Sequence, residues 1–117
     1  MPLDFSSPRE LRKHVKRHWA ELHLQSERDQ DAYLALARAF CDGPCQDGVS
    51  ECIRTCDQKI DRFRESSGEF GVLMPDRSMI LTFHILYPFG TAGVPVNRTH
   101  PFATNREYFD ADCECAT

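Results

Sequence analysis

The chain is predicted to fold as an α+β domain in which two N-terminal helices pack on one face of a small antiparallel sheet of about four strands. Apolar residues recur at helical spacing up to about residue 40, and they alternate with polar residues from about residue 59 onward. A stretch rich in turn-forming residues separates these two regions. A length of 117 residues is typical of one domain, so residues 1–117 are interpreted as a single unit.

The first helix is expected to run from Pro8 to about Leu24. Two serines precede a proline at the first helical position, which favours a helix start there. Two histidines, His14 and His18, are four residues apart and therefore share one face of the helix. They lie beside an apolar stripe at helical spacing, formed by Leu11, Val15, Trp19 and Leu22.

The second helix is expected from Glu27 to Phe40. Ser26 is a suitable N-cap, with Asp29 as the acid of a capping box. The side chains at helical spacing that should be buried are Tyr33, Leu36, Ala37 and Phe40.

Residues 41–56 are expected to form a turn-rich loop, after which the pattern changes to that of strands. Strands are predicted at 59–65, 69–74 and 79–86, with Pro75-Asp76 as the turn between the last two. A loop should follow from Tyr87 to Thr104 and lead to a last short element around Tyr108 and Phe109.

Alternation assigns the strand residues to two faces of the sheet. In the first strand, Ile60, Arg62 and Arg64 should share one face, with Asp61 and Phe63 on the other. In the last strand, the two expected sets are Met79, Leu81, Phe83 and Ile85, and Ile80, Thr82, His84 and Leu86.

The charge pattern is uneven along the chain. The net charge of −4 argues against a protein that binds nucleic acid through a strongly basic surface. One segment, from Arg9 to Arg17, nevertheless carries five basic residues opposed by a single Glu. This segment predicts a local basic patch on the first helix, and a solvated helix face is the alternative interpretation.

The order of several segments resembles the toxin nucleases of the barnase–EndoU–colicin–RelE superfamily, which occur in bacterial polymorphic and contact-dependent inhibition toxins. The matching segments span about Leu11 to Phe109 and read HVKRH, AYLALARAF, IDRF, EFGVLMPDRSMILTF and HPFATNREYF. The chain departs from the family at Arg77, where relatives usually have Gly, and at Leu81, where many have Arg.

The resemblance implies metal-independent cleavage of RNA, in which the ribose 2′-OH attacks the adjacent phosphate to give a cyclic phosphate. This reaction needs a base, an acid, and donors or cations for the phosphate oxygens. The implied catalytic residues are His18, Arg62, Thr82 and Tyr108, and the implied substrate-binding residues are Lys13, His14, Arg17, His84 and Asn105. The implied substrate is RNA, with tRNA expected, and the implied partner is a cognate immunity protein.

Each of these residues also has a purely structural interpretation. Histidines on a basic helix are often only solvated, and threonine is common in strands because it packs well there. His84 and His100 are alternative acids or bases to His18. A non-catalytic binding or regulatory module of the same fold is therefore the alternative function.

The six cysteines allow a third interpretation. Cys41, Cys45, Cys52 and Cys56 have the spacing C-x3-C-x6-C-x3-C, and a zinc-stabilised interaction domain would use them as four ligands. No CxxC pair occurs, so disulfides or free thiols, including the Cys113-x-Cys115 pair, are favoured over zinc. No cofactor is expected.

The chain shows neither a classical signal peptide nor a membrane span. Its longest uncharged stretch, from Ser78 to Asn97, is interrupted by prolines, glycines and a histidine. No membrane association is therefore expected. The resemblance implies a bacterial toxin domain that is secreted or delivered and acts in the cytoplasm of a target cell.

Overall fold

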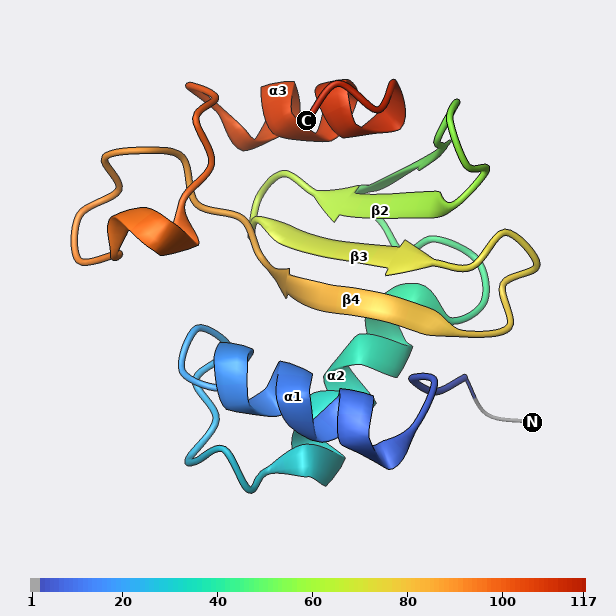
Figure 1. Ribbon diagram of the computed structural model, residues 1–117, viewed down its shortest axis with the longest axis vertical. Helices are drawn as coiled ribbons and strands as arrows, with labels where there is room; N and C mark the ends of the chain where they lie inside the picture. Colours follow the sequence, from blue (N-terminus) through green and yellow to red (C-terminus); the bar gives the residue numbers. More distant parts are fainter. Residues whose placement is uncertain (1–2) are drawn as a thin grey trace.

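The computed structural model describes residues 3–117, and it confirms the α+β class, with helices before a four-stranded antiparallel sheet. The elements in chain order are α1 (Pro8–His18), α2 (Gln30–Cys41), β1 (Val49–Ile53), β2 (Ile60–Arg64), β3 (Glu69–Leu73), β4 (Ile80–Ile85), the 3-10 helix η1 (Val96–Arg98) and α3 (Asn105–Cys113). The sheet has the order β1-β2-β3-β4. Figure 1 shows α3 on one side of the sheet and α1 and α2 on the other.

Helix α1 starts where the sequence predicts but ends earlier. The Ser7 hydroxyl accepts a hydrogen bond from the Glu10 N–H (3.2 Å), which caps the first turn. The predicted extension to Leu24 is wrong, because α1 ends at His18 and the chain continues in turns. His23 adopts a left-handed conformation (φ 60°), a geometry that ends helical winding.

Helix α2 begins at Gln30, three residues later than predicted. Asp29 occupies the N-cap position, but its carboxylate accepts from the Gln25 N–H (2.8 Å) and caps no helical N–H. The predicted capping box is therefore wrong. Three of the four expected core residues are buried, whereas Leu36 is exposed.

Strand β1 lies within residues 41–56, which were expected to form a loop. It pairs antiparallel with β2, from Val49 opposite Arg64 to Ile53 opposite Ile60. Its residues are half-buried or exposed, so the strand depends on this pairing more than on an apolar face.

The turn Pro75-Asp76 joins β3 and β4 as expected, but the alternation in β4 is interrupted. A bulge at Val72/Leu73 sets Leu73 opposite Ile80 and Val72 opposite Thr82. As a result Ile80 and Phe83 pack in one core cluster, which corrects the prediction that they face opposite ways.

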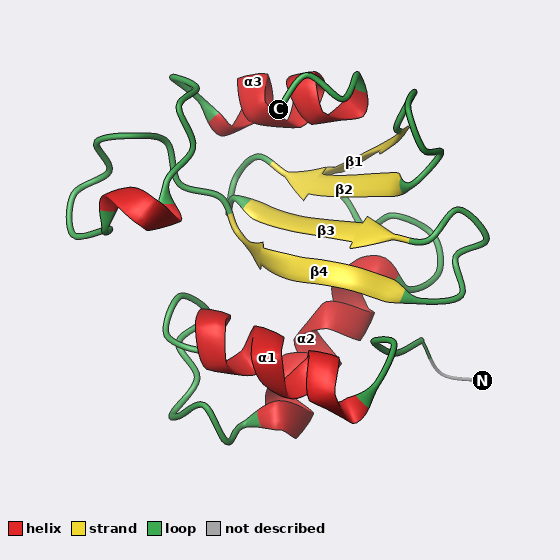
Figure 2. Ribbon diagram, in the orientation of Figure 1, coloured by secondary structure: helices red, strands yellow, loops and turns green. Residues whose placement is uncertain are grey.

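Two cores lie on the two faces of the sheet. The larger core joins α1 and α2 to the sheet, and it includes Val15, Tyr33, Phe40, Leu73 and Phe83. The smaller core joins α3 to the other face, with Phe63, Phe70, Val72, Leu86 and Phe109. The expectation of helices on a single face therefore holds for the two N-terminal helices, and α3 covers the second face (Figure 2).

Helix α2 packs closely on β3 because Gly71 has no side chain. A Cβ atom at this position would lie 2.8 Å from the Cys41 sulfur and 3.4 Å from the Phe40 ring. Any side chain here would push α2 away from the sheet.

Two disulfides, Cys52–Cys113 and Cys56–Cys115, connect β1 and the turn after it to the C-terminal end of α3. Cys41 and Cys45 are free thiols. Within residues 3–117, no helix has both the length and the apolar character that crossing a bilayer requires.

Candidate functional site

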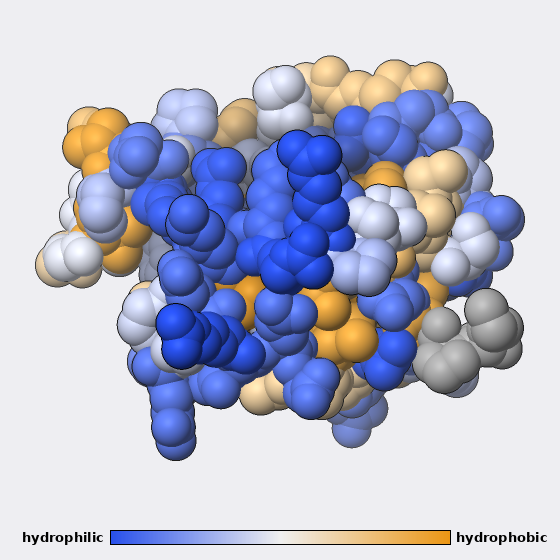
Figure 3. Space-filling view, turned by 60° about the horizontal axis from the view of Figure 1, so that its bottom comes forward, coloured by the Kyte–Doolittle hydropathy of each residue, from blue (hydrophilic) through white to orange (hydrophobic). Residues whose placement is uncertain are grey.

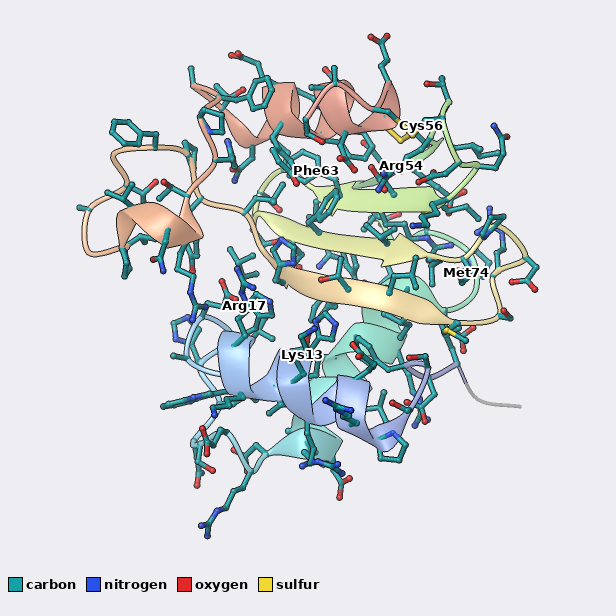
Figure 4. All side chains as sticks on the ribbon, in the orientation of Figure 1. Lys13, Arg17, Arg54, Cys56, Phe63 and Met74 are labelled. Atoms are coloured by element: carbon teal, nitrogen blue, oxygen red, sulfur yellow. A yellow bond between two sulfur atoms is a disulfide. The ribbon has the colours of Figure 1, made fainter. Side chains whose placement is uncertain are left out.

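A cleft of about 720 Å³ lies between α1, the outer edge of β4, the segment 97–102 and the start of α3. It receives side chains from four parts of the chain that are distant in sequence. Figure 4 shows Lys13 and Arg17 on α1 extending toward the sheet. The lining includes seven of the nine predicted site residues, namely Lys13, His14, Arg17, His18, Thr82, His84 and Tyr108.

Three histidines form a row along one wall of the cleft. The His18 ring stacks on His84 with centroids 4.9 Å apart, and it lies 6.1 Å from the His14 ring. Because His14 and His18 are one helical turn apart, α1 presents both to the edge of β4, where His84 is placed by the strand.

The environment of this row keeps two of the imidazoles neutral near pH 7. Burial and the neighbouring His18 lower the pKa of His84 to about 3. Burial, together with the same neighbour, lowers the pKa of His14 to about 4. At neutral pH these two rings therefore act as hydrogen-bonding and stacking groups without charge.

His18 differs from the other two because it has a carboxylate partner. Its Nδ1 contacts the Glu21 carboxylate, which is only slightly exposed. This contact directs Nε2 away from Glu21 and places the Nδ1 proton between the two groups. A carboxylate, an imidazole and a free ring nitrogen in this order make His18 suited to accept a proton from a substrate hydroxyl.

Thr82 lies next to the histidine row. Its hydroxyl is 3.1 Å from Nδ1 of His84, two residues along the same strand. The structure thus brings together the α1 imidazole and the sheet threonine that the resemblance implies.

The opposite wall is built around His100 and Tyr108, whose rings stack with centroids 4.8 Å apart. Burial raises the pKa of Tyr108 to about 12, so the phenol is protonated at neutral pH and can donate a hydrogen bond. This wall contributes the aromatic rings of His100, Phe102 and Tyr108 to the lining of the cleft.

His100 and Asn105 hold this wall in place and have no free groups for a substrate. Nε2 of His100 lies 2.8 Å from the Asn105 side-chain oxygen, and its Nδ1 accepts from the Phe102 N–H (3.3 Å). The Asn105 amide donates to the Leu86 carbonyl (3.1 Å). The expectation that Asn105 binds substrate is therefore corrected, because both ends of its amide are engaged in the protein.

Three cations border the cleft, namely Lys13, Arg17 and Arg98. The Arg98 guanidinium donates to the Arg17 main-chain carbonyl, which ties the segment containing η1 to the end of α1. Figure 3 shows that hydrophilic residues cover most of the face that carries α1. Two of the five basic residues in the patch predicted on α1, Lys13 and Arg17, thus line the cleft in a chain of net negative charge.

Arg62 does not reach this cleft, so its assignment to the phosphate is corrected. Its side chain is 2% exposed and lies on the α2 side of the sheet. Nε donates to Glu51 (2.8 Å), and the two terminal nitrogens donate to the carbonyls of Phe40 (3.2 Å) and Gly43 (2.5 Å). These contacts assign Arg62 to holding the end of α2 against the sheet.

The zinc cluster of Cys41, Cys45, Cys52 and Cys56 is also corrected. Cys52 and Cys56 each form a disulfide with a cysteine near the C-terminus, and Cys41 is buried beneath the sheet. The four sulfurs are therefore not available as one set of tetrahedral ligands.

Two residues of the site were not predicted from the sequence. Glu21 follows His18 by three residues, which is a usable signal for a helical partner. Arg98 has no local signal, because only the folding of the 87–104 segment brings it to α1. Comparison with models of protein families, with curated proteins and with solved structures finds no match for this chain.

Proposed function

We propose that this chain is a metal-independent endoribonuclease of the toxin type, which cleaves RNA by attack of a ribose 2′-OH on the adjacent phosphate. The observation that carries the proposal is the row of His14, His18 and His84 next to the Thr82 hydroxyl in a cleft bordered by cations. A proton acceptor, hydroxyl donors and positive charge are the groups that this reaction requires.

His18 is the proposed general base. Glu21 orients its ring and stabilises the imidazolium that forms when Nε2 takes the proton of the 2′-OH. His84 stacks on His18 and stays neutral, so it does not repel the charge that develops there. The contact with Glu21 and the stacking on His84 thus both position the His18 ring.

The phosphate is proposed to bind between the two walls. Lys13 and Arg17 balance the charge of the pentacoordinate intermediate, while Thr82 and Tyr108 donate hydrogen bonds to its oxygens. Tyr108 is protonated at neutral pH and is also the proposed proton donor to the leaving 5′ oxygen.

The proposed biological role follows the resemblance described above. The chain would act as a bacterial toxin domain on RNA, with tRNA expected, and a cognate immunity protein would bind and block it. A negative net charge suits this role, because the charge that contacts RNA is confined to α1 and Arg98.

The test is cleavage of total tRNA by the oxidised protein in EDTA. We expect cleavage to continue and to leave 2′,3′-cyclic phosphate ends. His18→Ala should lower the rate by about 10²–10⁴-fold, the usual contribution of a positioned acid or base. The products can be separated on a gel and their ends identified by phosphatase and ligase sensitivity.

His23→Asn is the matched control. His23 is an exposed histidine outside the cleft, and asparagine tolerates its left-handed backbone. This variant should cleave at the parental rate. A folded parent protein that leaves RNA intact would favour the non-catalytic module, and equal rates for the two histidine variants would exclude His18 as the base.

A further inference from the structure

Each of the two disulfides lies beside an aspartate. The sulfurs of Cys52 and Cys113 and a carboxylate oxygen of Asp61 lie within 4.8 Å of one another. The sulfurs of Cys56 and Cys115 form a similar group with Asp57. Both groups join the β1–β2 region to the C-terminal end of α3 (Figure 4).

The two aspartates differ in what surrounds them. Asp57 is fully engaged, because its carboxylate pairs with Arg54 (3.1 Å) and Lys59 (3.7 Å) and accepts from the Lys59 N–H (3.0 Å). Asp61 is 0% exposed, and neither of its oxygens has a donor in the described part of the chain. A buried carboxylate without a donor is costly and requires a compensating group.

Asp61 lies next to a second buried carboxyl group. Asp112 lies within hydrogen-bonding reach of Asp61 and is itself 5% exposed. Two carboxylates are both acceptors, so a proton or a cation must lie between them. Arg54 approaches one oxygen of Asp112 (3.6 Å) and supplies one positive charge, and the Thr117 hydroxyl donates to the other oxygen (2.6 Å).

We propose that reduction of the Cys52–Cys113 disulfide turns this group into a site for one zinc ion, with Cys52, Cys113 and Asp61 as the protein ligands and a water molecule in the fourth position. The Cys56–Cys115 pair is assigned no such site, because Asp57 is already neutralised by its two basic partners. Thiolates and carboxylates in a tetrahedral set are typical zinc ligands, whereas calcium and magnesium prefer oxygen alone.

A dithiol or glutathione can reduce the Cys52–Cys113 disulfide. Two electrons and two protons pass from the reductant to the Cys52–Cys113 bond, which breaks to give two thiols, and the reductant becomes a disulfide. Zinc then displaces the two thiol protons. The ion would keep α3 attached to the sheet in a reducing compartment, where the covalent bond is lost.

The experiment is a cobalt titration of the full chain in a phosphine reductant, followed by displacement with zinc. We expect the reduced protein to bind one cobalt ion with a sulfur-to-metal charge-transfer band and the visible spectrum of tetrahedral Co²⁺. The oxidised protein should show neither. Asp61→Asn should weaken binding at least ~10-fold, since even the loss of an outer-shell partner costs this much.

Asp57→Asn is the matched control and should bind cobalt like the parent. Among the cysteine variants, C56S/C115S should keep the charge-transfer band and C52S/C113S should lose it. Near-ultraviolet circular dichroism of the oxidised D61N protein checks that it folds. Equal binding by D61N and D57N, a band that survives in C52S/C113S, or a reduced parent that binds no cobalt would overturn the proposal.

Discussion

At the scale of single residues, their surroundings give the three histidines of the row, His14, His18 and His84, different roles. His14 and His84 have pKa values of about 4 and about 3, because desolvation opposes their charged forms. His18 alone contacts a carboxylate, that of Glu21. Identical side chains therefore divide into two neutral supports and one proposed base, and the division comes partly from neighbours that are distant in the chain.

His84 should make stability depend on pH, because the folded chain desolvates its ring. The unfolded chain takes up a proton at His84 below about pH 6.5, while the folded chain resists protonation down to about pH 3. The free energy of unfolding therefore falls as the pH drops through this window, by up to about 1.4 kcal/mol per pH unit from this group. His84→Gln should reduce that slope, measured by urea unfolding between pH 7 and pH 4.

His23→Asn again provides the comparison, because His23 is exposed. Its slope should match that of the parent. An unchanged slope in the His84→Gln protein would mean that His84 is readily protonated in the folded state and that its burial is less complete than the structure shows.

At the scale of elements, Arg62 connects β2 to the end of α2. Its guanidinium donates to the carbonyl of Phe40, which lies in the last turn of α2, to the carbonyl of Gly43 just after the helix, and to the Glu51 carboxylate on β1. One buried side chain thus joins three elements. The segment IDRF, for which the resemblance implied a phosphate ligand, here serves the packing of α2.

Removing this connection should cost stability without removing a cleft residue. Arg62→Met is expected to lower the free energy of unfolding by about 3–5 kcal/mol, since it leaves buried acceptors and Glu51 without their partner. RNA cleavage per folded molecule should stay near the parental rate. Urea unfolding and an activity assay at low temperature measure the two effects.

Arg77→Met is the matched change, because Arg77 pairs with the same Glu51 from a position 48% exposed. It should cost less than about 1 kcal/mol. If the two variants lose similar free energies of unfolding, or if the Arg62→Met protein is stable but inactive, the structural role of Arg62 is wrong and a role in RNA cleavage is favoured.

At the scale of the whole molecule, the disulfides join the middle of the chain to its end. They link residues 61 and 59 positions apart and hold α3, which carries Tyr108, onto the sheet. After either bond forms, the second closes only a few further residues. The chain-entropy gain therefore comes mostly from whichever bond forms first.

The disulfide variants should consequently be non-additive. In oxidised protein with EDTA, C52S/C113S or C56S/C115S alone should cost little, and loss of all four cysteines should lower the free energy of unfolding by about 2–5 kcal/mol. Urea unfolding of the three proteins measures this. Full and equal losses from each pair would show that the bonds stabilise through local contacts instead of through loop closure.

Local pattern was sufficient to predict the α+β class, the start of α1, strands β2 to β4, the turn at Pro75-Asp76 and the two faces of β2. These features depend on residues a few positions apart, where propensity and periodicity act. The early end of α1 and the late start of α2 were not predicted, because they depend on the conformation of His23 and the contacts of Asp29.

Tertiary contacts determined the features that the local sequence pattern did not predict or left ambiguous. Strand β1 exists because β2 pairs with it, Arg62 is structural because α2 ends beside it, and the cysteines pair with partners about sixty residues away. The cleft likewise exists only once α1, β4 and α3 have packed together. The physical reason is that hydrogen-bond partners, burial and charge neighbours are set by three-dimensional proximity, which the order of residues constrains but does not display.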